Sequence, residues 1–252
     1  TGVDIAWAME CFENELISVQ DTGGLELRWG NADAMVKLTE QIAKREGFGD
    51  LLANGAYRAA EIIGRDTLKH VVHVKKQEVP MHDPRIKHGL NIGYATSPTG
   101  ADHVHNIHDD AYQTEAGIAG LRCIGIHEPL PFDDLSPAKV RLVKRWINNR
   151  VFYNCVGMCN FMSYDMTAQC EVVAAATGWD FSMFEQQEIG ERCMAMAREF
   201  NRRAGFTAKD DVPPKRFSEP TQKGPNEGKF IPDDVMSEAL RMYYDMMGWD
   251  HE

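Results

Sequence analysis

Long hydrophobic runs are absent from this 252-residue sequence, and positive charge is scarce in it. No apolar run approaches the roughly 18 residues that a membrane-spanning helix requires, so we expect no membrane association. The 27 Lys and Arg residues are outnumbered by 38 Asp and Glu residues, which leaves a formal charge of −11. Because affinity for nucleic acids depends mostly on clustered Lys and Arg, this balance argues against a nucleic-acid-binding protein.

Cysteine is sparse as well, with six residues in the whole chain. That density is far below the density of a disulfide-stabilised secreted domain, so we expect reduced thiols and a cytoplasmic location. The first residue is Thr1 and not Met, which predicts a processed chain or a fragment. With 43% hydrophobic and 26% charged residues, the composition is typical of a folded globular chain of one large or two small domains.

Strand patterns are almost missing, whereas apolar residues recur at helical spacing through most of the chain. Alternating β-branched residues occur only over 70–74, which is too little to build a sheet. We therefore predict an all-α, multihelical fold. N-cap signals precede several of the helices, including a capping box at Ser182 and Glu185. The predicted helices cover residues 3–16, 31–46, 51–63, 136–151, 163–178, 182–205 and 233–247.

One long segment breaks this pattern. From Glu78 to about His108 the periodicity fails, and turn-forming residues and histidines accumulate. We predict a long irregular loop there, and we interpret it as functional because it also carries aromatic and apolar residues. A boundary near residue 72 separates a smaller helical part, residues 1–72, from a larger one, residues 73–252.

The segment 102–110 contains three histidines, His103, His105 and His108, among carboxylates. Imidazoles and carboxylates at this density bind a metal ion or transfer protons. One hypothesis is therefore a metal-dependent hydrolase. The run differs from the His-x-His-x-Asp-His pattern of metallo-β-lactamases, because its acidic residues follow the third histidine, and the chain lacks the strands of that fold. A solvated loop with one working histidine is the alternative.

A second candidate is the pair Cys155 and Cys159, which flank Gly157 at a predicted helix end. The two thiols could bind a metal or pack as small apolar side chains. An iron–sulfur cluster needs about four ligands, usually thiolates, and the other cysteines are scattered singly: Cys11, Cys123, Cys170 and Cys193. The chain alone therefore does not contain a complete cluster site.

A third candidate is His82-Asp83-Pro84-Arg85. Proline fixes the turn, and an arginine in a loop can bind an anion with two hydrogen bonds. A salt bridge within the loop explains the same residues equally well.

Several strings, taken in order, resemble the tungsten-dependent aldehyde:ferredoxin oxidoreductase family, specifically its two C-terminal helical domains 2 and 3. Each string is weak alone, but together they span nearly the whole chain. They occupy residues 6–11, 24–31, 45–53, 82–85, 93–97, 200–206 and 248–250.

The resemblance implies a tungsten (or molybdenum) bis-pterin cofactor, a [4Fe–4S] cluster, and oxidation of an aldehyde to a carboxylic acid with electrons passed to ferredoxin. The family's β-rich, pterin-binding N-terminal domain and its other cluster thiolates lie upstream of the residue that matches Thr1. Residues 1–72 would then be the C-terminal part of domain 2, and residues 73–252 domain 3. The implied partners are that missing domain, a ferredoxin-type acceptor, a small aldehyde and possibly a second copy. Both cofactors would be absent from the isolated fragment, which would be inactive.

The resemblance also assigns site residues. The family's second pterin motif, Asp-x-x-Gly-Leu-Cys-x-Phe, matches residues 154–161, where Asn154 replaces Asp, Gly157 is kept and Met158 replaces Leu. Cys159 matches the fourth cluster ligand, and His103 matches the histidine near the metal. This hypothesis predicts an exposed apolar face near Asn154, Cys159 and His103. A non-catalytic helical interaction module, the remaining alternative, predicts no such face.

Overall fold

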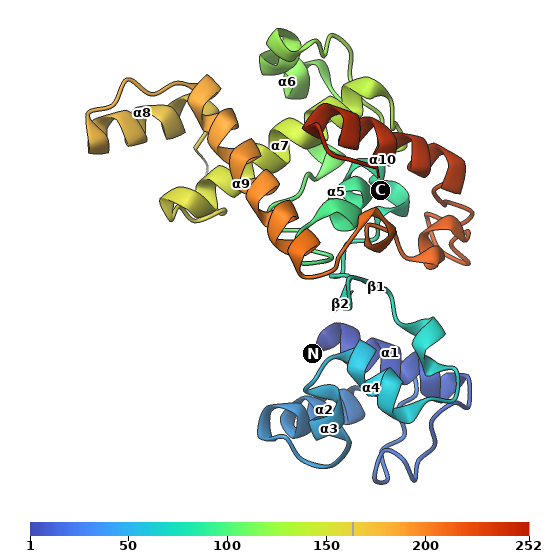
Figure 1. Ribbon diagram of the computed structural model, residues 1–252. Coiled ribbons are helices and arrows are strands. Elements are labelled where there is room, and N and C mark those ends of the chain that lie inside the picture. The colour runs from blue at the N-terminus through green and yellow to red at the C-terminus, as the bar shows by residue number, and fades with distance from the viewer. Residues whose placement is uncertain (163, 252) are drawn as a thin grey trace. The chain divides into compact units, whose positions relative to one another are not determined.

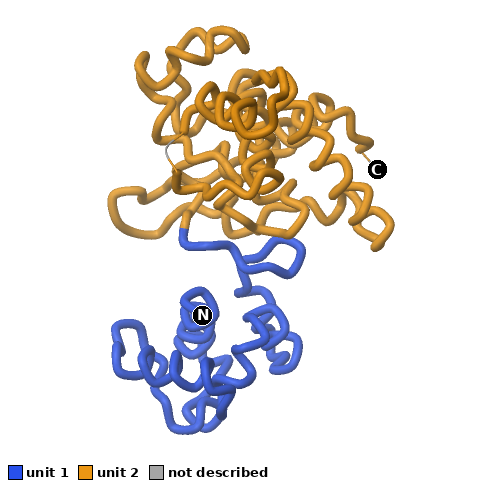
Figure 2. Tube along the Cα trace, turned by 90° about the vertical axis from the view of Figure 1, so that its left-hand side faces the viewer, with its two compact units in different colours: residues 1–81 blue, residues 82–252 orange. Residues whose placement is uncertain are grey.

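The computed structural model describes residues 1–162 and 164–251, and over these residues the fold is helical with two short strands (Figure 1). The predicted all-α class is confirmed. The chain divides into two compact units, Thr1–Met81 and His82–Glu252 (Figure 2). No helix in the described part of the chain combines the length and apolarity needed to cross a membrane.

The division between the units lies after the predicted position 72, because a small hairpin belongs to the first unit. Strands β1 (His73–Val74) and β2 (Gln77–Glu78) pair antiparallel, with His73 opposite Glu78. The Glu78 carboxylate accepts a hydrogen bond of 2.9 Å from the backbone N–H of Tyr57, which attaches the hairpin to the helices of that unit. The assignment of 1–72 and 73–252 to family domains stays a prediction.

The first unit packs four helices around an apolar core that includes Trp7 and Leu38. The helix predicted over 51–63 is two helices, because Gly55 adopts φ 91° between them, a conformation that favours glycine. Trp7 also donates an indole hydrogen bond of 3.1 Å to the Thr67 carbonyl. The elements are α1 (Gly2–Glu13), α2 (Ala32–Lys44), α3 (Gly47–Leu52), α4 (Ala56–Ile63) and the 3₁₀ helix η1 (Thr67–His70).

The second unit is built around α7 (Pro137–Val156), which packs against α5 (His88–Thr96), α9 (Met183–Arg203) and α10 (Asp233–Met247) (Figure 1). The remaining helices are α6 (Glu115–Ile118), α8 (Met166–Thr177), η2 (Pro84–Ile86), η3 (Asp109–Tyr112), η4 (Ala119–Ile124), η5 (Ala208–Asp210) and η6 (Lys215–Ser218).

Helix α5 corrects the prediction that residues 78–108 form one irregular segment. All nine of its residues are buried, so no polar face alternates with an apolar one. A helix that is enclosed on every side loses the periodicity on which the prediction rested. Two glycines in it, Gly89 and Gly93, also lower its intrinsic helix propensity.

The predicted N-terminal signals of three helices are confirmed. Asn31 caps α2, Ser136 caps α7, and the side chains of Ser182 and Glu185 form the capping box of α9. Helix α8 begins after Asp165, whose side chain accepts a hydrogen bond from the Ala168 N–H. The predicted start of that helix, Ser163, lies outside the described residues.

Candidate functional site

Three imidazole rings from the segments that flank α5 in the sequence lie close together. His82 precedes this helix, and His103 and His108 follow it. The ring centroids of His82 and His103 lie 4.6 Å apart, and those of His82 and His108 lie 4.9 Å apart. His103 and His108 are 6.0 Å apart. We call His82, His103 and His108 the imidazole cluster. The segment 102–110 indicates His103 and His108 as candidates, but nothing in the sequence indicates that His82 lies beside them.

His105 does not join this cluster. Its Nδ1 lies 3.0 Å from an Asp102 carboxylate oxygen, and only 6% of the residue is exposed. This hydrogen bond is the main cause that lowers the pKa of Asp102. The ligand set His103, His105 and His108, expected for a metal-dependent hydrolase, is therefore not assembled. Over residues 1–162 and 164–251, no group of three or more His, Cys, Asp and Glu side chains is arranged to hold a metal ion.

The electrostatic environment lowers the pKa of two members of the imidazole cluster, His82 and His108. Burial, followed by the neighbouring His103 and Lys87, lowers the pKa of His82 below its usual value. Burial, followed by Lys87 and the two other imidazoles, lowers the pKa of His108. Asp110 opposes both shifts. His82 and His108 are therefore neutral at neutral pH, and a neutral imidazole is able to accept a proton.

Glycines on α5 let the histidine-bearing loop lie directly on the helix. A Cβ atom at Gly93 would lie 1.9 Å from the side-chain oxygen of Asn106, and one at Gly89 would lie 2.7 Å from Asp109 Oδ1. The Asn106 amide donates to the Leu90 carbonyl (2.8 Å), and Trp146 of α7 donates to the Asn106 carbonyl (3.0 Å). The spacing Gly89-x-x-x-Gly93 is the sequence signal that could have indicated this contact.

A buried ion pair fixes the end of the same loop. The Lys139 ammonium of α7 donates to Asp109, and both side chains are 0% exposed. Lys139 also donates to the Pro131 carbonyl at 2.9 Å. Asp109 directly follows His108, so the pair anchors the imidazole cluster to α7.

Replacing Asp109 by alanine should lower the free energy of unfolding by about 3–5 kcal/mol, because it leaves the Lys139 ammonium buried without its counter-ion. Urea unfolding of the full-length protein, followed by far-UV circular dichroism, measures this loss. Asp110→Ala is the matched control, because Asp110 pairs with Lys87 at the surface and should cost about 1 kcal/mol or less. Equal losses in the two variants would contradict the role of the buried pair.

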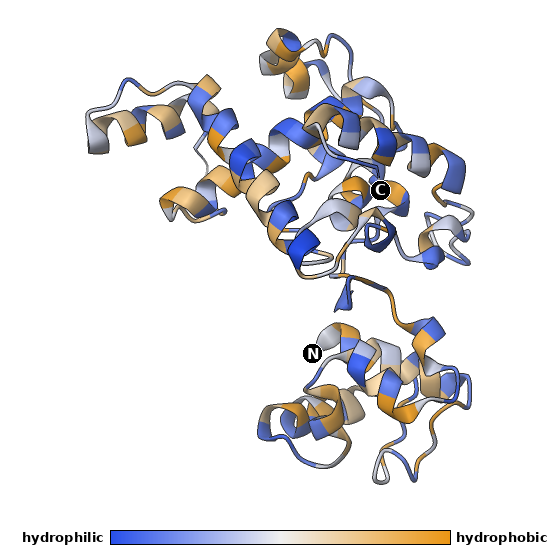
Figure 3. Cartoon of the chain, in the orientation of Figure 1, coloured by the Kyte–Doolittle hydropathy of each residue, from blue (hydrophilic) through white to orange (hydrophobic). Residues whose placement is uncertain are grey.

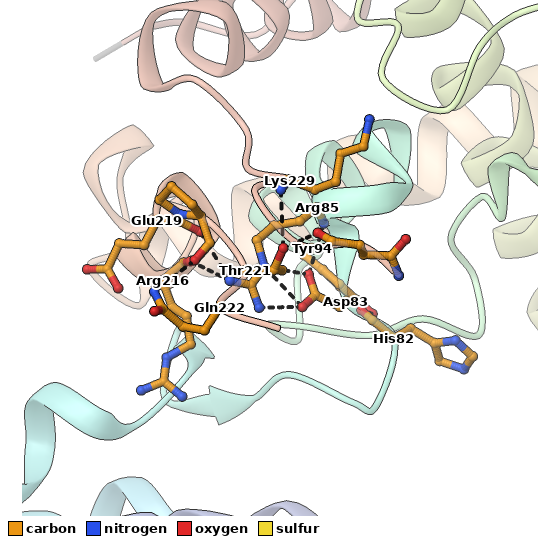
Figure 4. A network of polar contacts seen from close by, with 11 residues as sticks. His82, Asp83, Arg85, Tyr94, Arg216, Glu219, Thr221, Gln222 and Lys229 are labelled. Atoms are coloured by element: carbon orange, nitrogen blue, oxygen red, sulfur yellow. Dashed lines mark hydrogen bonds and ion pairs between the residues drawn. The ribbon is translucent and has the colours of Figure 1, made fainter. Parts of the chain in front are cut away.

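Arg85 forms the salt bridge within the loop that the sequence of residues 82–85 offers as one interpretation. Its guanidinium binds the Asp83 carboxylate through Nε (3.0 Å) and Nη2 (2.5 Å), and Nη1 donates to the Glu219 carbonyl at 3.1 Å (Figure 4). The Tyr94 hydroxyl donates to the His82 carbonyl at 3.0 Å. The His82 imidazole points away from this network, as Figure 4 shows. The motif thus holds the backbone of His82 in place.

The four residues expected to bind cofactor lie together in the turn that ends α7. Gly157 adopts φ 70° and closes the helix, and the Met158 N–H donates to the Tyr153 carbonyl at 2.9 Å. Asn154, Gly157 and Cys159 are exposed, and Met158 is half-buried. Cys159 is a free cysteine. The turn therefore presents a thiol and an amide at the surface of the second unit.

A pocket of about 790 Å³ adjoins this turn and includes Asn160 and Phe161 in its wall. The Arg150 guanidinium lies 4.7 Å from the ring centroid of Trp146 and 5.4 Å from that of Tyr153, both of which also line the pocket. Arg150 donates to the Asn160 carbonyl at 3.1 Å, so it also holds the turn. Aromatic walls with a guanidinium group suit a planar or anionic group.

Large apolar side chains are exposed around the turn and on α8 and α9. Figure 3 shows hydrophobic colour at the end of α7 and along α8. Exposed apolar surface is typical of binding faces, whereas the alternative of a non-catalytic helical module predicts no exposed apolar face of this kind. The most exposed of these side chains are Phe161 (90%), Phe200, Phe184, Met196 and Trp179.

The sequence matches the family described as aldehyde ferredoxin oxidoreductase, domains 2 & 3, over residues 1–252. It is similar to the tungsten-containing aldehyde ferredoxin oxidoreductase of Pyrococcus horikoshii, with 36% identity over 260 residues, and to that of Pyrococcus furiosus, with 36% identity over 259 residues. Both matches cover 100% of this chain and 40% of the relative. The chain thus spans less than half the length of these relatives.

The fold also has a counterpart among solved structures. The active-site complex BamBC of benzoyl coenzyme A reductase, in complex with 1,5-dienoyl-CoA, matches with a TM-score of 0.66 and 21% sequence identity. The match covers 98% of this chain and 41% of that chain. At this identity the likeness is one of fold.

Proposed function

The chain belongs to the aldehyde ferredoxin oxidoreductase family, whose domains 2 and 3 it carries, and from this premise we propose that it is part of an enzyme that oxidises an aldehyde to a carboxylic acid. The enzyme would contain a tungsten (or molybdenum) bis-pterin and a [4Fe–4S] cluster, and a ferredoxin-type protein would accept its electrons. The observation that carries the proposal is the exposed turn 154–161, which presents the free thiol of Cys159 beside a pterin-type motif.

The thiol of Cys159 fits a cluster ligand, but only as one of four. A [4Fe–4S] cluster takes about four thiolates, and no group of three or more His, Cys, Asp and Glu side chains among the described residues is arranged to hold a metal ion. A single exposed cysteine at a helix end is what one chain segment would contribute if the other ligands came from elsewhere in the protein. Cys159 would therefore complete a cluster whose remaining thiolates lie outside residues 1–252.

The residues before Cys159 would hold the pterin. The Asn154 amide is exposed and offers both a donor and an acceptor, but no charge, where the family motif has an aspartate. Gly157 allows the sharp turn after α7, and the half-buried Met158 anchors it. When bound, the metal–pterin group supplies the two-electron chemistry, while the protein positions the substrate and handles protons.

His103 is the proposed proton-transfer residue. Conversion of an aldehyde to an acid adds the oxygen of one water and releases two protons and two electrons. His103 would polarise the aldehyde oxygen or accept one of these protons as a general base. The neutral rings of His82 and His108 lie beside it and would pass the proton on, since each is able to accept and donate through its two nitrogens.

The exposed apolar side chains support a further domain that covers this face. Relatives are longer than this chain, which spans 40% of their length. A cofactor held between two domains is not held by one, so we expect residues 1–252 alone to be inactive.

The direct test is made on the full-length protein, purified without oxygen. We expect tungsten or molybdenum, about four iron atoms per chain, and aldehyde-dependent reduction of a viologen dye. Elemental analysis and a dye assay with aliphatic and aromatic aldehydes measure these properties. Protein that contains both cofactors yet reduces no dye with any aldehyde would overturn the proposed reaction, and bound zinc without iron would overturn the family cofactors.

A further inference from the structure

Two thiols that the proposed function does not use face each other across α7 and α9. Cys155 lies in the last turn of α7 and Cys193 lies within α9. Their Sγ atoms are 3.3 Å apart, and both cysteines are free. We propose that Cys155 and Cys193 are an oxidisable dithiol, whose disulfide cross-links α7 to α9.

Close packing of the two helices fixes this geometry. A Cβ atom at Gly190 would lie 2.1 Å from the Asn148 carbonyl oxygen, so the backbones of α9 and α7 almost touch there. Cys193 follows Gly190 by about one helical turn, and Cys155 follows Asn148 by about two. Figure 1 shows the two helices crossing. A disulfide requires the sulfur atoms about 2.05 Å apart, so they must approach by roughly 1.2 Å, a distance within reach of side-chain rotation.

The surroundings of the pair determine how it reacts. Partial burial of the sulfur atom in this otherwise exposed residue, followed by the hydrogen bond with Cys193, raises the pKa of Cys155 to about 11. At neutral pH Cys155 is therefore a thiol, whereas the attacking species in disulfide exchange is the thiolate. Attack by Cys155 should therefore be slow at neutral pH and should accelerate as the pH rises.

A small-molecule disulfide is the oxidant. One thiolate of the pair attacks a sulfur of the small disulfide, which forms a mixed disulfide and releases one small thiol. The second thiolate then attacks the protein sulfur of that mixed disulfide and displaces the other small thiol. In total the protein pair loses two protons and two electrons, and the small disulfide gains them.

The cross-link would act on the end of α7. Cys155 lies four residues before Cys159 and directly after Asn154. A bond to Cys193 would fix the last turn of α7 to α9 and leave Cys159 unmodified. Closing the loop between residues 155 and 193 also restricts the unfolded chain, which should raise the melting temperature of the protein.

The test incubates the full-length protein with oxidised glutathione in the absence of oxygen. The remaining thiols are then alkylated, and the digest is analysed by mass spectrometry. We expect one linked pair of peptides, containing Cys155 and Cys193, that forms faster at higher pH and disappears on reduction with dithiothreitol. The link should be absent from Cys155→Ser and from Cys193→Ser. It should persist in Cys123→Ser, the control, since Cys123 is not part of the pair and its thiol donates to the Gly120 carbonyl.

Three results would overturn the proposal: a link between Cys155 and Cys159, mixed disulfides with glutathione alone, or unmodified Cys155 and Cys193. None of them depends on aldehyde oxidation, because the assay detects the cross-link itself. Conversely, an inactive enzyme that still forms the Cys155–Cys193 link would leave this inference standing.

Discussion

Serine in place of Cys159 should remove most of the iron from the full-length protein while its fold is retained. Iron–sulfur clusters are held by thiolates, and a serine hydroxyl is a harder, far less acidic ligand that iron–sulfur sites do not favour. Cys159 is an exposed free cysteine, so the substitution should cost little stability. Iron and acid-labile sulfide per chain, with the visible absorption of the cluster, measure the loss.

Cys155→Ser is the matched control for this variant. Cys155 lies at the end of the same helix and is also exposed, but its sulfur contacts Cys193. We expect this control to retain its iron. Full iron in Cys159→Ser would exclude Cys159 as a ligand, and equal losses in both variants would point to a general sensitivity of the turn at the end of α7.

The fold is predictable from the sequence wherever a helix has one solvent-exposed face and one buried face. Single residues predict two of its helix ends. Ser182 and Glu185 form the expected capping box of α9, and Gly157 ends α7 as expected. Helix α5 was missed because it is buried on every side. A helix without a solvent-facing side leaves no periodic signal, and its glycines, which allow the close approach of Asn106 and Asp109, look like turn residues.

The candidate site was predictable only in part, for a related reason. The local run 102–110 indicates His103. His82 lies about 20 residues earlier in the sequence, and its ring comes close to that of His103 only through the folding of the segment between them, which contains α5. The buried pair of Lys139 and Asp109 was equally hidden, since a lysine on a helix is normally read as a solvent-facing residue. Such contacts depend on packing between distant segments, which one sequence does not encode locally.

Asparagine in place of His103 should reduce turnover about 10²- to 10⁴-fold, the range that general acid–base catalysis contributes. The asparagine amide is similar in size and polarity to part of the imidazole, but it does not take up a proton at neutral pH. Cofactor content should therefore be retained while the proton-transfer step is lost. The measurement is kcat with an aldehyde, together with the metal and iron content of the same sample, across a range of pH.

The variant His105→Asn distinguishes proton transfer by His103 from a structural role of the histidines in this loop. His105 lies two residues away on the same loop, but its imidazole binds Asp102 and stays outside the imidazole cluster. If the loop merely needs its histidines to keep its shape, both variants should lose activity to a similar extent. If His103 transfers a proton, the turnover of His103→Asn should fall much further than that of His105→Asn. An unchanged turnover in His103→Asn would exclude His103 as the proton-transfer residue.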